Sequence, residues 1–128
     1  MKDLGLLFLR LSFGGGMFFA HGWPKLIGFS EKMQQFPDPI GLGSPFSLAL
    51  AVFGEAVCAV AVMIGFKTKI FAVPTFITMA VAFFVIHSGD PWSAKELAFV
   101  YGCGFAAMIF LGSGRFSLDW WLKGEKSL

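Results

Sequence analysis

Four polar side chains that could bind a ligand or relay a proton interrupt otherwise apolar stretches of this sequence. They are Arg10, His21, Glu55 and His87. An ionisable group left unpaired in an apolar environment is costly, so each of these side chains must face a partner or a polar ligand. We therefore take the four residues as the candidate ligand-binding site. The sequence assigns no catalytic residue and no metal ligand.

Arg10 and Glu55 are the most deeply placed of the four. Arg10 lies ~9 Å and Glu55 ~15 Å from the ends of their apolar stretches, at ~1.5 Å per helical residue. In a helix, Arg10 shares one face with Gly14, Met17, His21 and Lys25. Long side chains can bridge the remaining difference in depth. The sequence therefore predicts a buried Arg10–Glu55 ion pair or a polar ligand that both residues share.

The chemistry of this pair has two interpretations. It either fixes the register of two helices, or it belongs to a site that binds a quinone head group or relays protons. His21 and His87 close their apolar stretches and would form the rim of a polar cavity. A haem between them is disfavoured, because the chain has only these two histidines and no Cys-x-x-Cys-His motif. Quinone is the candidate cofactor.

The two cysteines have two interpretations, of which packing is the favoured one. Cys58 and Cys103 both lie within apolar stretches rather than in loops, so we expect free thiols used in packing. A redox pair is the alternative, and it would need a nearby positive group such as Arg10 to stabilise a thiolate.

The composition defines the environment in which these residues act. The chain has 128 residues, of which 56% are hydrophobic and 14% charged, and its mean hydropathy is +0.73. These values are typical of a small polytopic membrane protein in contact with the lipid bilayer. The net charge of +2 is small and scattered, so a nucleic-acid partner is not expected. We expect one domain over residues 1–128.

The apolar stretches predict an all-α fold, an antiparallel bundle of four transmembrane helices with short interfacial helices. The predicted spans are about 4–21, 46–66, 70–87 and 94–111. Pro24 is expected to end the first helix, and Ser44 to cap the second. Ser93 and Glu96 form a capping-box pattern that predicts the start of the fourth.

The distribution of basic residues predicts the orientation of the bundle. One side would carry Lys2, Lys67, Lys69, Arg115, Lys123 and Lys126, and the other Lys25, Lys32 and Lys95. By the positive-inside rule, both termini are expected in the cytoplasm of a bacterium, with the four spans in its inner (plasma) membrane.

The chain resembles the DoxX family of small bacterial membrane proteins. The residues that carry the resemblance are Arg10, the segment 19–26 (Phe-Ala-His-Gly-Trp-Pro-Lys-Leu), Gly54–Glu55, the basic turn with Thr68, His87 and the segment 112–119. The resemblance implies a four-helix membrane bundle. For some members it also implies association with quinone-linked sulfur oxidation or with oxidative-stress complexes.

The leading interpretation is a quinone- or redox-associated membrane subunit in which the four candidate residues line a polar cavity. One alternative is a non-catalytic scaffold for a soluble oxidoreductase, and another is a small-molecule binder or transporter. A redox subunit should bind quinone, a scaffold should have a filled core, and a transporter should have a cavity reachable from both faces. A homo-oligomer is also compatible with so small a bundle.

Overall fold

The computed structural model describes residues 1–123, and in this part of the chain four helices are long and apolar enough to cross a membrane. They are Lys2–Ile27, Ser44–Ile64, Thr68–Ile86 and Trp92–Leu111. No strand occurs among the described residues. The predicted all-α class and four spans are confirmed. Lys126, which the orientation argument counted with the inner residues, lies outside the described residues.

The first span is one continuous helix with two π-helical segments. Its parts are α1 (Lys2–Leu9), η1 (Arg10–Gly14), α2 (Gly15–Met17), η2 (Phe18–Gly22) and α3 (Trp23–Ile27). The expectation that Pro24 ends this helix is wrong. Pro24 is the second residue of α3, directly after the π-helical segment η2, and the helix passes through it without a break as far as Ile27. The helix therefore carries Lys25 within the span.

The other three spans contain two further π-helical segments. Their parts are α5 (Ser44–Val52), η3 (Phe53–Val57), α6 (Cys58–Ile64), α7 (Thr68–Val81), η4 (Ala82–Ile86) and α8 (Trp92–Leu111). Two short helices lie outside the spans, α4 (Phe29–Lys32) and α9 (Leu118–Lys123).

Both predicted N-caps are wrong. Ser44 is the first residue of α5, and the preceding Gly43 has φ 96°. The carboxylate of Asp38 instead organises this turn, because it accepts hydrogen bonds from the N–H groups of Leu42 and Gly43, both at 2.9 Å. The fourth span begins at Trp92 without a side-chain cap, so the capping-box pattern at Ser93 falls inside the helix.

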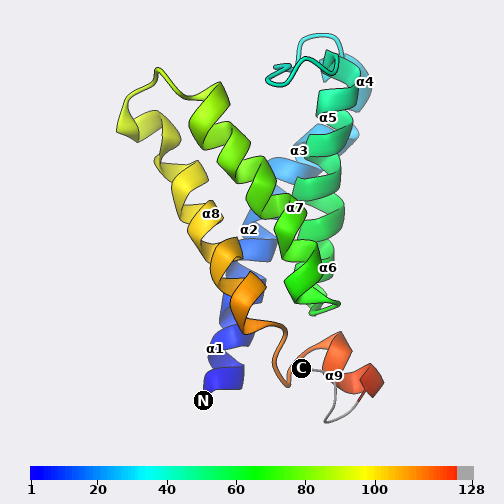
Figure 1. Cartoon of the computed structure of the whole chain (residues 1–128). Helices are drawn as coiled ribbons and strands as arrows, with labels where there is room; N and C mark the ends of the chain where they lie inside the picture. Colours follow the sequence, from blue (N-terminus) through cyan, green and yellow to red (C-terminus); the bar gives the residue numbers. More distant parts are fainter. Residues whose placement is uncertain (124–128) are drawn as a thin grey trace.

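The spans converge at one end of the bundle and diverge at the other (Figure 1). In Figure 1, α7 and α8 lie side by side and lean away from α5 toward the upper end. The main core lies where the spans converge, and its buried members are Met17, Ala59, Val62, Ala72, Met79, Phe105 and Met108. A smaller cluster, formed by Leu48, Val52 and Ala56, lies along α5 and η3. The upper ends of α5 and α7 are therefore not joined by this core.

Candidate functional site

A cavity of about 500 Å³ lies between the diverging helices. Its lining comes from all four spans and from the segment 36–40. Most of the lining is apolar, for example Leu50, Ile77 and Leu97. The polar groups that face it are His21, Lys25, Ser47, Glu55, Thr78, His87 and Tyr101. The cavity therefore combines apolar walls with a small number of hydrogen-bonding groups, as small-molecule sites do.

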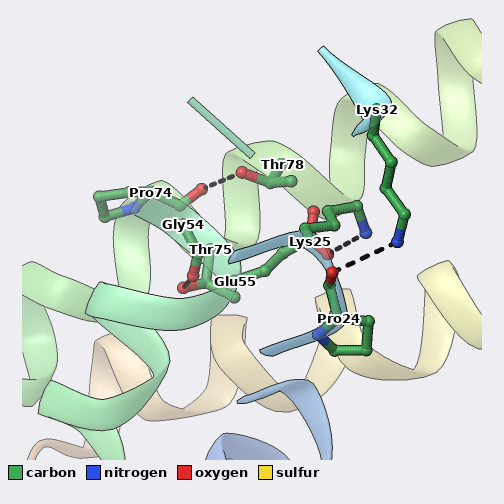
Figure 2. Close-up of polar contacts among 8 residues, drawn as sticks. All are labelled: Pro24, Lys25, Lys32, Gly54, Glu55, Pro74, Thr75 and Thr78. Carbon is green, nitrogen blue, oxygen red and sulfur yellow. Dashed lines mark hydrogen bonds and ion pairs between the residues drawn. The ribbon is translucent and has the colours of Figure 1, made fainter. Parts of the chain in front are cut away.

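An ion pair between Lys25 and Glu55 lies in the wall of this cavity. The Nζ of Lys25 is 2.7 Å from Oε1 of Glu55, and the two side chains are 21% and 6% exposed (Figure 2). The predicted Arg10–Glu55 pair is therefore wrong. The helix continues past Pro24, so Lys25 lies one turn beyond His21 and reaches the depth of Glu55 on the neighbouring span.

Close backbone packing fixes the position of Glu55. A Cβ on Gly22 would overlap the carbonyl group of Glu55, so only glycine allows η2 to approach η3 this closely. On the other side, Thr75 donates a hydrogen bond to the carbonyl oxygen of Gly54 at 2.5 Å (Figure 2). A Cβ on Gly54 would lie 2.6 Å from Oγ1 of Thr78. Glu55 is thus held between the first and third spans.

All four candidate residues lie in or beside a π-helical segment. Arg10 begins η1, His21 lies in η2, Glu55 lies in η3, and His87 directly follows η4. A π-helical turn shifts the direction of the side chains that follow it, and such turns often occur at functional sites. No residue pattern in the sequence signalled these turns.

The two histidines differ in their surroundings. The ring of His21 packs edge to face against Tyr101, with centroids 5.6 Å apart. Nδ1 of His87 lies 2.8 Å from Oδ2 of Asp90, in a pair that is more exposed. Sequence reasoning missed Tyr101, although it is the only tyrosine of the chain and lies in an apolar stretch. A lone hydroxyl within an apolar stretch is the signal that could have identified Tyr101 as a site residue.

Arg10 lies away from the cavity, near the converging end of the bundle, and is 1% exposed. Its guanidinium group donates hydrogen bonds to the carbonyl oxygens of Met63, at 2.9 Å, and Phe116. The carbonyl of Met63 belongs to the last turn of α6, where carbonyl groups lack helical partners. Arg10 therefore caps α6 and attaches the segment after α8 to it. Three of the four predicted residues line one cavity, and Arg10 does not.

Within residues 1–123, both cysteines are free thiols; Cys58 is buried and Cys103 exposed. No group of three or more His, Cys, Asp or Glu side chains within residues 1–123 is arranged to hold a metal ion. The cavity instead offers donors from Lys25, His21 and Tyr101 and an acceptor from Glu55.

These features define a small four-span membrane protein with a mainly apolar cavity and an intramembrane ion pair in its wall. The chain belongs to the DoxX family, whose model matches residues 5–88. The resemblance seen in the sequence is thereby confirmed. The matched range contains all four candidate residues, most of the first span and the whole of the second and third, whereas α8 with Tyr101 follows it.

One relative covers nearly the whole chain. "Inner membrane protein YqjF" of Escherichia coli (strain K12) is 27% identical over 123 residues, which are 93% of this chain and 92% of that protein. No solved structure matches this chain. Together with the four apolar spans, this relative supports a multi-pass protein of a bacterial inner membrane.

Proposed function

We propose that this DoxX-family protein is a quinone- or redox-associated membrane subunit that binds a quinone head group in the cavity of about 500 Å³. One observation carries the proposal. His21, Tyr101 and the Lys25–Glu55 pair, from three different spans, face one cavity whose remaining walls are largely apolar. A ligand that fits such a lining has a polar head and an apolar body.

A quinone matches these groups in chemical terms. Its two carbonyl oxygens accept hydrogen bonds, which the imidazole N–H of His21 and the hydroxyl of Tyr101 can donate. Its isoprenoid tail can lie along Leu50, Ile77 and Leu97. The Lys25 ammonium is held by Glu55, so it would orient a carbonyl oxygen without leaving its partner. Any transfer of electrons would involve a partner oxidoreductase.

The proposal predicts that binding depends on the polar lining more than folding does. His21→Phe and Tyr101→Phe should each weaken the binding of a quinone analogue by about fivefold to tenfold, the value of one hydrogen bond of ~1 kcal/mol. His87→Phe should act in the same direction, because His87 also lines the cavity. Glu55→Gln should reduce both binding and stability. Fluorescence titration of the purified protein with the analogue measures binding, and thermal unfolding measures stability.

Tyr101→Phe provides the matched control for packing, since it keeps the ring against His21 and removes only the hydroxyl. If no analogue binds, or if the histidine and tyrosine variants bind it like the unaltered protein, the quinone proposal is wrong. The scaffold interpretation is then the better one. A cavity that admits polar reagents from both membrane faces would instead favour a transporter.

A further inference from the structure

A second cavity, of about 280 Å³, lies at the converging end of the bundle, away from the proposed quinone site. It is formed where the turn between α6 and α7 meets Gly112 and Ser113 and the short helix α9. Three exposed lysines line it, namely Lys67, Lys69 and Lys123. Two of them come from the turn and the start of α7, and the third from α9. Positive side chains from two separated parts of the sequence thus line one pocket.

The floor of this pocket is held by internal hydrogen bonds. Asp119 is buried and accepts hydrogen bonds from the backbone N–H of Lys67, at 2.7 Å, and from the hydroxyl of Ser113, at 2.8 Å. The Ser113 oxygen also lies 2.8 Å from Oγ1 of Thr68. The positive charge of Arg10 also attracts the carboxylate of Asp119. The single carboxylate of the lining is therefore already compensated from within the protein.

The lysine ammonium groups are not compensated in this way. Among residues 1–123, no carboxylate lies within ion-pair distance of Lys67, Lys69 or Lys123. The 14-residue helix α7 begins at Thr68, so the positive end of its dipole adds to the same pocket. A concave, basic surface of this kind suits a phosphate group.

The surroundings favour a phosphate that belongs to a lipid. The pocket lies where the second span ends at Ile64 and the third begins at Thr68, which is the level of the lipid head groups. Ile70 lines the pocket and is 61% exposed, and Trp121 on α9 is 78% exposed. Apolar surface thus continues from the basic pocket toward the hydrocarbon. We infer that the pocket binds the phosphate of an anionic phospholipid, with an acyl chain lying along Ile70.

The test measures lipid binding to the full-length protein in detergent by native mass spectrometry. The probes are phosphatidylglycerol, zwitterionic phosphatidylcholine with the same acyl chains, and soluble glycerol 3-phosphate. Phosphatidylglycerol should bind more tightly than phosphatidylcholine, and Lys69→Gln with Lys123→Gln should lower its affinity by about tenfold or more. Replacing both lysines by arginine should preserve binding. Both side chains are exposed, so thermal unfolding should be unchanged.

The control pair, Lys2→Gln with Arg115→Gln, removes the same charge from two residues that do not line the pocket. Both belong to the same end of the bundle, where the backbone N–H of Arg115 donates a hydrogen bond to Asp3, the neighbour of Lys2. It should change the affinity less than about twofold. An equal loss of affinity in both pairs of variants would show that phosphatidylglycerol binds through diffuse surface charge, and would overturn the inference. Equal binding of phosphatidylcholine would overturn it too, by showing that only acyl chains are recognised. So would displacement of phosphatidylglycerol by an equal concentration of glycerol 3-phosphate, which would indicate a site for a soluble anion.

Discussion

At the scale of single residues, the Lys25–Glu55 pair is a buried interaction whose loss should be costly. Glu55 is the less exposed member, at 6%, whereas the longer Lys25 is 21% exposed at the cavity. Removing one partner of a buried pair leaves an uncompensated charge, and the cost depends on whether that charge can reach water. Lysine can extend toward the interface, but a glutamate in the middle of a helix cannot. The two single variants should therefore differ.

We expect Lys25→Met to lower the free energy of unfolding by about 3 kcal/mol or more, because it leaves Glu55 unpaired. Glu55→Leu should cost less, because Lys25 keeps access to the cavity mouth. The double variant Lys25→Met with Glu55→Leu should recover much of the loss, giving a coupling of about 1–3 kcal/mol. Chemical denaturation in detergent micelles measures the free energy of unfolding of the unaltered protein, the two single variants and the double variant.

The matched cycle uses Arg10→Met with Glu55→Leu. Arg10 contacts the carbonyl oxygens of Met63 and Phe116 rather than Glu55. The changes in the free energy of unfolding caused by Arg10→Met and Glu55→Leu should therefore add to within about 0.5 kcal/mol. Strong coupling in this second cycle, together with additivity in the first, would contradict the ion pair seen here.

At the scale of the elements, the contact between η2 and η3 controls where Glu55 lies. Two π-helical segments meet there with no side chain between Gly22 and the carbonyl of Glu55. A tightly packed interface cannot absorb an added methyl group without moving a helix. The geometry of the candidate site thus depends on a glycine that contacts only the backbone of its neighbour.

Gly22→Ala should destabilise the protein by about 1–3 kcal/mol and weaken binding of any ligand that uses Glu55. Its control is Gly5→Ala in α1, where an added Cβ would meet nothing within 4 Å. That substitution should be neutral or stabilise the helix by up to about 1 kcal/mol. Thermal unfolding compares the two variants, and equal effects would argue against the close approach of η2 and η3.

The loop before α5 gives a prediction about pH. The hydrogen bond from the backbone N–H of Gly43, above all, lowers the pKa of Asp38, with further bonds from Ser47 and Leu42. The loop contacts should be fully present above the unfolded-state pKa of about 4 and be lost as the pH falls through the lower folded-state pKa. The NMR shifts of the Leu42 and Gly43 amides should report this titration. Asp38→Asn should abolish it.

At the scale of the whole molecule, the bundle has two distinct ends. The N-terminus, the turn at Lys67 and α9 lie at the converging end, and the segments 33–43 and 87–91 lie at the open end (Figure 1). The cavity proposed for quinone belongs to the open part, and the basic pocket to the other end. The orientation of these ends relative to the cytoplasm stays a prediction from the charge distribution.

Cysteine labelling in intact cells and in inverted membrane vesicles tests this orientation. Lys32→Cys should react with a membrane-impermeant maleimide from the periplasmic side, and Lys69→Cys only from the cytoplasmic side. Cys103, which is exposed on α8, should first be replaced by alanine to remove background labelling. Reaction of the Lys32→Cys protein only in inverted vesicles would reverse the predicted topology.

The sequence by itself determined the features that depend on local composition. Four apolar stretches predicted four spans to within a few residues at most ends, because length and hydropathy alone decide whether a helix can cross a bilayer. The order of polar residues within them was also enough to indicate the DoxX family. Intramembrane charge identified Glu55 as a residue that needs a partner, without naming that partner.

Only the tertiary structure decided which partner Glu55 has. Lys25 reaches it because the first helix continues through Pro24 and because Gly22 lets η2 approach η3, and neither fact follows from residue type. The position of Tyr101 at the cavity, and the capping of α6 by Arg10, likewise arise from packing between distant segments. Depth along a helix is a local property, whereas register between helices depends on side-chain packing along their whole contact.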